Sequence, residues 1–214
     1  MMKLSKSSAT VLIILGCFFI GFLAKFAVEH SASLVRPDVN LARAKGNSKA
    51  PVRVTEFVDF QCKACSKGVE VLRNYFKKYP QKIYIEVKHY PLSKIHWHAV
   101  KSAVYAECAA RQNKFWPYQD LLFQNQQIWD RLINPDNMFK ELAQKAGLNL
   151  SALDVCVQDE KIKKFVLDEK SQGEAMRVNS TPTYFINGKM LVGHKELSAE
   201  LEKLFPEETQ NQKP

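Results

Sequence analysis

Two cysteines separated by two residues, in a Cys-Lys-Ala-Cys motif over 62–65, constrain this 214-residue chain more than any other feature. Residues 52–60, directly before the motif, are rich in β-branched and aromatic side chains, which is typical of a strand. Residues 67–79, after it, carry apolar side chains at helical spacing. A Cys-x-x-Cys pair between a strand and a helix is a specific arrangement. It predicts a fold in which a strand delivers both sulfurs to the start of a helix.

We expect Cys62 to be the reactive member of this pair. The start of a helix exposes unpaired N–H groups and the positive end of the macrodipole, which stabilise a thiolate, and Lys63 adds a cation. The pKa of Cys62 should therefore lie below the free value of about 8.5. Cys62 is then the exposed nucleophile, and Cys65, more buried, resolves the mixed disulfide that Cys62 forms.

Two other uses of the motif have to be weighed. A purely structural disulfide between the two cysteines is one. A zinc site is the other, but zinc requires a second pair of ligands at suitable spacing. Cys108 and Cys156 are isolated, and His96 with His98 lacks that spacing. We therefore expect neither a metal nor a cofactor.

The remaining pattern predicts an α/β fold. Its elements are a second strand over 83–90, a long helical stretch over 97–177, two strands over 183–186 and 190–192, and a last helix over 197–204. Asn187-Gly188 is a strong signal for the turn of a hairpin. This order gives a three-layer core of about four strands with an inserted helical subdomain. The expected boundaries are 51–95 and 178–205 for the core and 96–177 for the insertion.

Both ends of the chain fall outside this core. Two lysines precede an apolar run over 9–24, so residues 1–28 are typical of a signal anchor or signal peptide. Bulky or charged residues surround the small ones, which favours an uncleaved anchor. Residues 29–50 are polar and are interpreted as a linker, and residues 206–214 as a disordered tail. The net charge of +9 is scattered along the chain, which argues against nucleic-acid binding.

Thr181-Pro182 leads into the strand over 183–186. Proline cannot donate to a strand ladder, so Pro182 marks either a trans edge position or a cis bond. A cis bond would turn the Thr181 backbone outward, where it could pair with an extended substrate.

Glu56 lies six residues before Cys62, and strand alternation places both on one side. An inward carboxylate there could take the proton of Cys65, whereas an outward one would face water.

Several ordered motifs resemble those of the DsbA-like thiol–disulfide oxidoreductases, close to their membrane-anchored bacterial branch. The resemblance covers residues 51–205. It rests on Val-Thr-Glu-Phe-Val-Asp-Phe-Gln-Cys-x-x-Cys over 54–65, Lys-His-Tyr-Pro-Leu over 88–92, His98-Ala99 with Phe115-Trp116, and Val-Asn-Ser-Thr-Pro-Thr-Tyr-Phe-Ile-Asn-Gly over 178–188.

This resemblance implies a thioredoxin fold with an inserted helical domain. It also implies that Pro182 is cis and faces the cysteines, and that Glu56 matches the buried acidic residue of the family. Two positions depart from the best-known oxidases, which have His where this chain has Ala64 and Val where it has Thr181. Both positions tune the redox potential.

Cys108 and Cys156 form our hypothesis of a second, non-catalytic disulfide. Of the five cysteines Cys17 lies in the apolar N-terminal segment, so an even number belongs to the exported part. Two buried thiols are the alternative.

The favoured function is a disulfide oxidase that donates the Cys62–Cys65 disulfide to exported proteins and is reoxidised by a DsbB-like or VKOR-like membrane partner. It would work outside the cytoplasm, anchored to the inner membrane. No separate dimerisation domain, which isomerases of this class usually carry, is recognisable. An isomerase or reductase kept in the dithiol form is the second enzymatic candidate. A non-enzymatic assembly factor that captures a client or a metal is the third.

Overall fold

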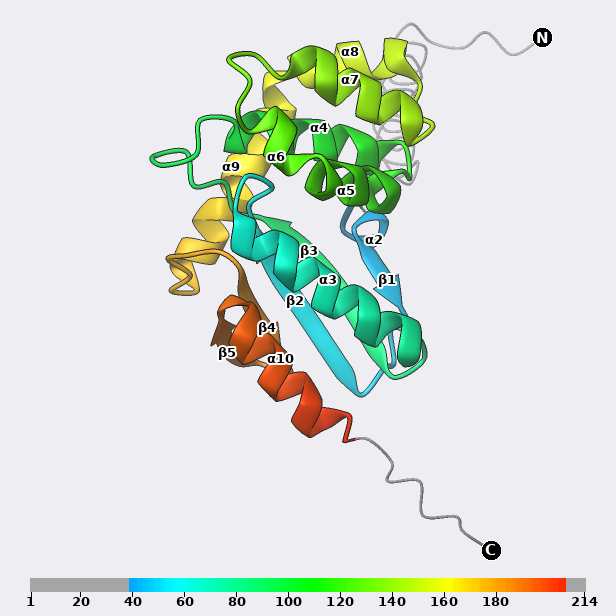
Figure 1. Ribbon diagram of the computed structural model, residues 1–214, viewed down its shortest axis with the longest axis vertical. Coiled ribbons are helices and arrows are strands. Elements are labelled where there is room, and N and C mark those ends of the chain that lie inside the picture. The colour runs from blue at the N-terminus through cyan, green and yellow to red at the C-terminus, as the bar shows by residue number, and fades with distance from the viewer. Residues whose placement is uncertain (1–38, 207–214) are drawn as a thin grey trace, which may run out of the picture. The chain divides into compact units, whose positions relative to one another are not determined.

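A computed structural model describes residues 39–206 (Figure 1). The predicted signal segment and almost all of the predicted tail lie outside these residues. Within the described part, no helix combines the length and the apolar character needed to cross a bilayer.

A five-stranded mixed sheet with the order β1-β3-β2-β4-β5 forms the centre of the fold. The central strand β2 pairs in parallel with β3 and antiparallel with β4. Asn187 and Gly188 both have positive φ and form the predicted hairpin turn between β4 and β5. The strands are β1 (Ala44–Gly46), β2 (Val52–Val58), β3 (Ile83–His89), β4 (Thr183–Ile186) and β5 (Lys189–Val192).

Helices cover both faces of this sheet, which confirms the predicted α/β class. α3 (Lys63–Lys78) and α10 (Gly193–Leu204) lie together on the face shown in front in Figure 1. α9 (Glu160–Ala175) lies against the opposite face, where Gly173 meets Phe57. A Cβ at Gly173 would stand 2.8 Å from the Phe57 ring, so this close approach requires glycine.

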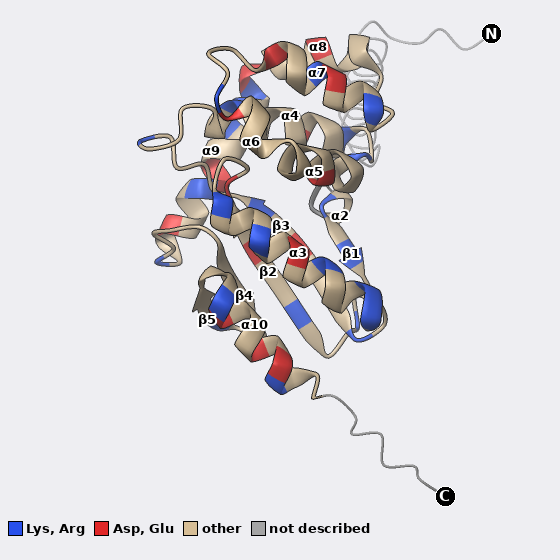
Figure 2. Cartoon of the chain, in the orientation of Figure 1, with Lys and Arg blue, Asp and Glu red and all other residues tan. Residues whose placement is uncertain are grey.

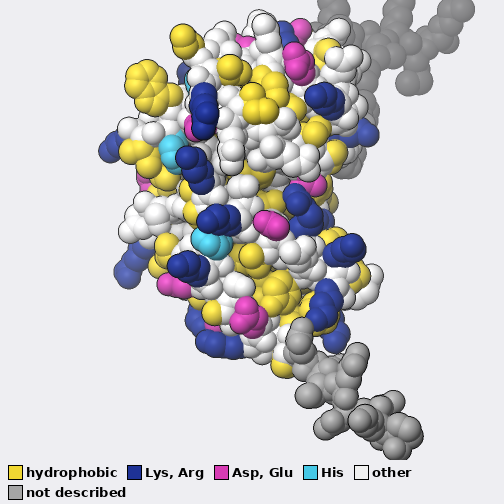
Figure 3. All heavy atoms as spheres, in the orientation of Figure 1, with side chains coloured by type: hydrophobic (Ala, Val, Ile, Leu, Met, Phe, Trp, Pro, Cys, Tyr) yellow, Lys and Arg dark blue, Asp and Glu magenta, His cyan; other side chains and the backbone are white. Residues whose placement is uncertain are grey.

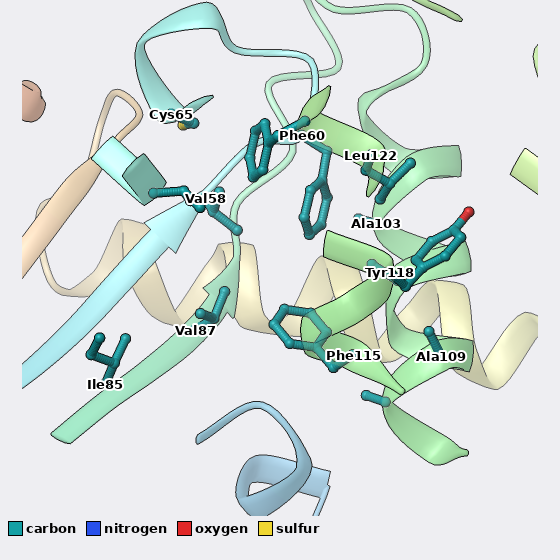
Figure 4. Packing of buried hydrophobic residues seen from close by; sticks show 14 of the residues in the cluster. Val58, Phe60, Cys65, Ile85, Val87, Ala103, Ala109, Phe115, Tyr118 and Leu122 are labelled. Atoms are coloured by element: carbon teal, nitrogen blue, oxygen red, sulfur yellow. The ribbon is translucent and has the colours of Figure 1, made fainter. Parts of the chain in front are cut away.

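The predicted helical insertion consists of α4 to α9, which lie between β3 and β4 in the chain. Its aromatic side chains continue the core of the sheet, and Figure 4 shows Phe60 and Phe115 between the strands and these helices. The first five of these helices are α4 (Ala99–Arg111), α5 (Phe115–Gln124), α6 (Gln126–Trp129), α7 (Asp136–Lys145) and α8 (Leu150–Gln158).

The predicted linker over 29–50 is wrong for its second half. Residues 39–46 form α2 (Val39–Ala42) and β1, which adds a fifth strand beside β3. Arg43 is fully buried and donates two hydrogen bonds to Glu169, at 2.6 and 2.8 Å. A partner 126 residues away compensates the buried guanidinium, so a polar segment without apolar periodicity is folded here.

Charged side chains are distributed over both the helices and the strands (Figure 2). On the face seen in Figure 3, Lys and Arg are spread between acidic and hydrophobic side chains. The positive net charge is therefore dispersed across this face.

Candidate active site

The Cys-Lys-Ala-Cys motif stands at the N-terminus of α3. Cys62 is the N-cap residue, and its carbonyl accepts the N–H groups of Cys65 and Ser66 at 3.1 and 3.4 Å. Both cysteines of the motif are free thiols. Cys65 is fully buried, and Cys62 is 9 % exposed, less than expected for the nucleophile, because the segment before β4 packs against its sulfur.

That segment contains Thr181 and Pro182, which are joined by a cis peptide bond. The sulfur of Cys62 donates a hydrogen bond to the carbonyl of Thr181 at 3.4 Å. The Thr181 hydroxyl is buried and has no hydrogen-bond partner within residues 39–206. A donor is therefore available beside the sulfur whenever Cys62 is a thiolate.

The pKa of Cys62 is lowered to about 6. The hydrogen bond with Cys65 lowers this pKa most, against burial, which raises it. The Thr181 side chain and the N–H groups of Cys65 and Ala64 lower it further. The backbone N–H groups at the start of the helix thus stabilise the thiolate, as the position of the motif predicts. The Lys63 side chain, in contrast, is exposed to solvent.

The pKa of Cys65 moves in the opposite direction. Burial raises it well above its ordinary value, and the hydrogen bond with Cys62 and the charge of that residue raise it further. One sulfur is therefore prepared to attack as an anion, and the other holds its proton until a base removes it.

Glu56 lies in the middle of β2 and is 1 % exposed. Burial raises its pKa to about 8, while the charge of Lys45 and the Tyr184 hydroxyl lower it. Tyr184 is its register partner on β4, so both side chains lie on the face covered by α3. Glu56 also raises the pKa of Cys65, which places the carboxyl within electrostatic reach of that thiol. The outward alternative for Glu56 is wrong.

Lys45 is a site residue that the sequence analysis missed, because it lies in the predicted linker. Its ammonium stands 3.8 Å from the ring centroid of Trp116 and 5.0 Å from that of Phe76. Burial lowers its pKa, while the charges of Asp120 and Glu56 raise it. A half-buried cation on β1 therefore acts on the buried carboxyl of Glu56.

Side-chain amides and a carboxylate fix the turn that carries Cys62. Gln126 of α6 donates to the carbonyls of Phe60 and Cys62 at 2.7 and 3.1 Å. The carbonyl of Asp59 accepts the Cys62 N–H at 3.1 Å, and its carboxylate accepts the Gln61 N–H at 2.8 Å. Two polar residues between the strand and the motif, Asp59 and Gln61, were the sequence feature from which this hydrogen-bonded turn could have been predicted.

Cys108 and Cys156 are joined by a disulfide with an S–S distance of 2.00 Å. It links α4 to α8 within the helical block. Both residues are thus unavailable for redox exchange with the motif as thiols.

Comparison with known proteins places the chain in a family. The model of a protein family described as thioredoxin matches residues 40–204. Among curated proteins, a Na(+)/H(+) antiporter NhaA 1 of Mycolicibacterium vanbaalenii is 32 % identical over 154 residues, which are 72 % of this chain and 24 % of that protein. The chain thus spans about a quarter of the length of such relatives.

Two solved structures share the fold. α-DsbA1 of Wolbachia pipientis is 22 % identical, with a TM-score of 0.66 over 76 % of this chain and 88 % of that one. Oxidised BdbD of Bacillus subtilis is 19 % identical, with a TM-score of 0.66 over 78 % of this chain and 95 % of that one. The chain belongs to the thioredoxin family, and its fold is that of the DsbA-type thiol–disulfide oxidoreductases.

Proposed function

We propose that this protein is a disulfide oxidase that donates a Cys62–Cys65 disulfide to the thiols of exported proteins. The observation that carries the proposal is the position of Cys62 at the N-terminus of α3, next to a fully buried Cys65, which lowers the pKa of Cys62 to about 6. A stabilised thiolate favours the reduced form of the pair. The corresponding disulfide is then a stronger oxidant.

In the proposed reaction, a substrate thiolate attacks the sulfur of Cys62 in the disulfide and the S–S bond to Cys65 breaks. Cys65 leaves as a thiolate and takes a proton. A second substrate thiolate then attacks the substrate sulfur of the mixed disulfide, and Cys62 leaves as a thiolate. Two electrons pass from the substrate dithiol to the protein, which ends with one thiolate and one thiol, while the other substrate proton goes to solvent.

Glu56 is the group that we assign to the proton of Cys65. Its pKa of about 8 lets it hold a proton near neutral pH and exchange it with the thiol. One oxygen of its carboxyl, Oε1, is buried without a hydrogen-bond partner within residues 39–206. That oxygen is free to carry the proton.

Thr181 and Pro182 are the residues that we assign to the substrate. The Thr181 backbone stands at the sulfur of Cys62 and would pair with the extended chain on either side of a substrate cysteine. Lys63 and Ala64 are the two residues between the cysteines. The Lys63 side chain is exposed, so neither residue covers the sulfur of Cys62.

We place the reaction outside the cytoplasm, with the N-terminal segment as a membrane anchor and a DsbB-like or VKOR-like protein as the reoxidising partner. The basic and apolar N-terminus supports this location. So does the Cys108–Cys156 disulfide, since such bonds persist in oxidising compartments. A thioredoxin-like protein of Salmonella enterica with the same fold is described as periplasmic.

A reductase or isomerase is the second candidate, favoured by Thr181 and Ala64, which stand where the best-known oxidases have Val and His. Disulfide donation separates the two. The oxidised full-length chain is mixed with an unfolded, reduced protein that forms a single disulfide, and free thiols are counted with time. An oxidase removes one pair of substrate thiols per chain. If the oxidised chain leaves the substrate thiols intact, the oxidase assignment is wrong.

A further inference from the structure

His96 lies outside the cysteine motif, in the segment between β3 and α4, yet it reaches the turn that carries Cys62. Its ring Nδ1 is 2.8 Å from Oδ2 of Asp59. The Asp59 side chain is fully buried, whereas the His96 ring keeps 22 % of its exposure. A partly accessible, titratable ring is thus attached to a buried carboxylate.

Asp59 is held firmly in this position. Its two carboxylate oxygens accept the backbone N–H groups of Gln61 and Leu92, at 2.8 and 2.9 Å. Its own carbonyl accepts the N–H of Cys62. These bonds connect the ring of His96 to the reactive cysteine through one residue whose backbone and side chain are both fixed.

A positive charge on His96 offsets the negative charge of the Asp59 carboxylate. The buried Asp59 carboxylate belongs to the turn whose carbonyl accepts the Cys62 N–H, and like charges in one turn oppose each other. An imidazolium on the carboxylate would compensate that charge and favour the thiolate. Inside the motif, Lys63 is exposed and Ala64 carries no charge, so His96 is a cation that the motif itself does not supply.

Cys62 is one of the charged groups that act on the His96 ring. The hydrogen bond to Asp59 raises the pKa of His96 most, against burial, and the charges of Asp59, Cys62 and Asp130 raise it further. Coupling between two sites is reciprocal. If the thiolate of Cys62 favours the imidazolium, the imidazolium favours the thiolate by the same free energy.

We propose that His96 is a positioning residue whose imidazolium, held by Asp59, stabilises the thiolate of Cys62. When Cys62 and Cys65 form a disulfide, the fraction of His96 rings that are protonated falls. The proposal deepens the proposed redox function, on which it rests. It applies to an oxidase and to a reductase alike, since both pass through the same thiolate.

The redox step balances with glutathione disulfide as oxidant. The thiolate of Cys62 attacks one sulfur and releases one glutathione thiolate. Cys65 then loses its proton and attacks the sulfur of Cys62, which releases the second glutathione thiolate. The pair loses two electrons and one proton, and the negative charge beside His96 disappears. The hold on the imidazolium proton weakens accordingly, so a further fraction of a proton leaves for solvent.

The test is a pH titration of the histidine rings by NMR in the full-length chain, with labelled histidine, in the reduced form and in the form oxidised by glutathione disulfide. The expected result is a higher midpoint for His96 in the reduced form than in the oxidised form. His98 is the internal control, because its ring Nε2 lies 2.8 Å from the carbonyl of Leu132 and not at the Asp59 carboxylate that holds His96. No substitution is needed, so the result does not depend on how a variant folds.

Two outcomes of this titration would overturn different claims. Equal midpoints for His96 in both forms, with the Cys62–Cys65 disulfide verified by mass spectrometry, would overturn the inference and leave the proposed function intact. Failure of the two cysteines to form a disulfide would overturn the proposed function and the inference with it.

A pair of matched variants provides a second readout. Titration of the thiolate absorbance at 240 nm should give a higher pKa for Cys62 in H96Q than in the wild-type chain, and an unchanged value in H98Q. A value for H96Q equal to that of the wild type would also overturn the proposal.

Discussion

The sulfur of Cys62 and the carbonyl oxygen of Thr181 lie 3.4 Å apart, although the two residues are 119 positions apart in the chain. The strand that ends before the motif and the strand that begins after Pro182 are neighbours in the sheet, which brings the two residues together. In the proposed reaction, one substrate chain would therefore meet both the thiol of Cys62 and the backbone of Thr181.

Substitution of the resolving cysteine should trap a covalent complex. In C65S, Cys62 can still form a mixed disulfide with a substrate thiol, but no buried thiol is left to displace the substrate. Non-reducing electrophoresis after incubation with a reduced client and glutathione disulfide should show an adduct that dithiothreitol removes. C62S is the matched control and should form none. Equal amounts of adduct from both variants would show that Cys62 is not the attacking sulfur.

Replacement of Glu56 should slow the release of the trapped substrate. E56Q keeps the size of the side chain but cannot accept the proton of Cys65, whose pKa lies well above the ordinary range. General-base contributions of this kind are typically about 100-fold or more. Rapid-mixing measurements at pH 7 should show that the mixed disulfide decays more slowly by this factor. The pKa of Cys62 should stay close to its wild-type value, because Glu56 is not among the main groups that shift it. An unaltered decay rate would remove Glu56 from the reaction.

The same carboxyl should leave a signature in the pH dependence of stability. Its pKa rises from 4.5 to about 8 on folding, so between these values the folded chain binds more protons than the unfolded chain. The free energy of unfolding of the wild type should therefore fall as pH rises from about 5 to about 8. In E56Q this component is absent, so urea titrations should show the variant gaining stability relative to wild type across that range. A constant difference between the two proteins would contradict the assignment.

Gly68 should resist even a methyl group. A Cβ at this position would stand 1.8 Å from the hydroxyl of Tyr184, the register partner of Glu56. G68A should therefore lose about 1–3 kcal/mol of unfolding free energy through overpacking. Removing the hydroxyl in Y184F should restore part of the loss, so the double variant should be less destabilised than the sum of the single variants. Strict additivity would show that the two side chains do not meet.

The Cys108–Cys156 disulfide should contribute to stability without taking part in the reaction. It closes a loop with a sequence separation of 48 residues, and its removal in C108A/C156A should cost about 2–4 kcal/mol. Chemical unfolding measures this cost, and the thiolate titration of Cys62 should be the same as in the wild type. Alkylation of both residues in the wild type without reductant, detected by mass spectrometry, would contradict the bond.

Local patterns predicted the fold wherever a segment is amphipathic or β-branched. The strand before Cys62, the helix after it and the Asn187-Gly188 hairpin all follow from side-chain periodicity and turn chemistry. β1 was missed because its three residues, Ala44–Gly46, show no alternation. The burial of Arg43 was missed because its partner Glu169 is distant in the chain.

The candidate site divides in the same way. Cys62 and Cys65 could be predicted as the redox pair because their spacing and their place between strand and helix are encoded locally. Lys45, His96 and Gln126 reach the motif from three separate segments, and no local pattern indicates where their side chains end. Tertiary packing alone brings these polar groups together.

We propose that Cys62 is a stabilised thiolate and that its disulfide with Cys65 is an oxidant of other thiols. The equilibrium reduction potential of this pair in the full-length chain, measured in glutathione buffers by acid trapping and mass spectrometry of the peptide that contains both cysteines, tests it most directly. Because the pKa of Cys62 is lowered only to about 6, we expect a potential between about −180 and −120 mV, above that of thioredoxin. A potential near about −270 mV would contradict it and identify a reductase.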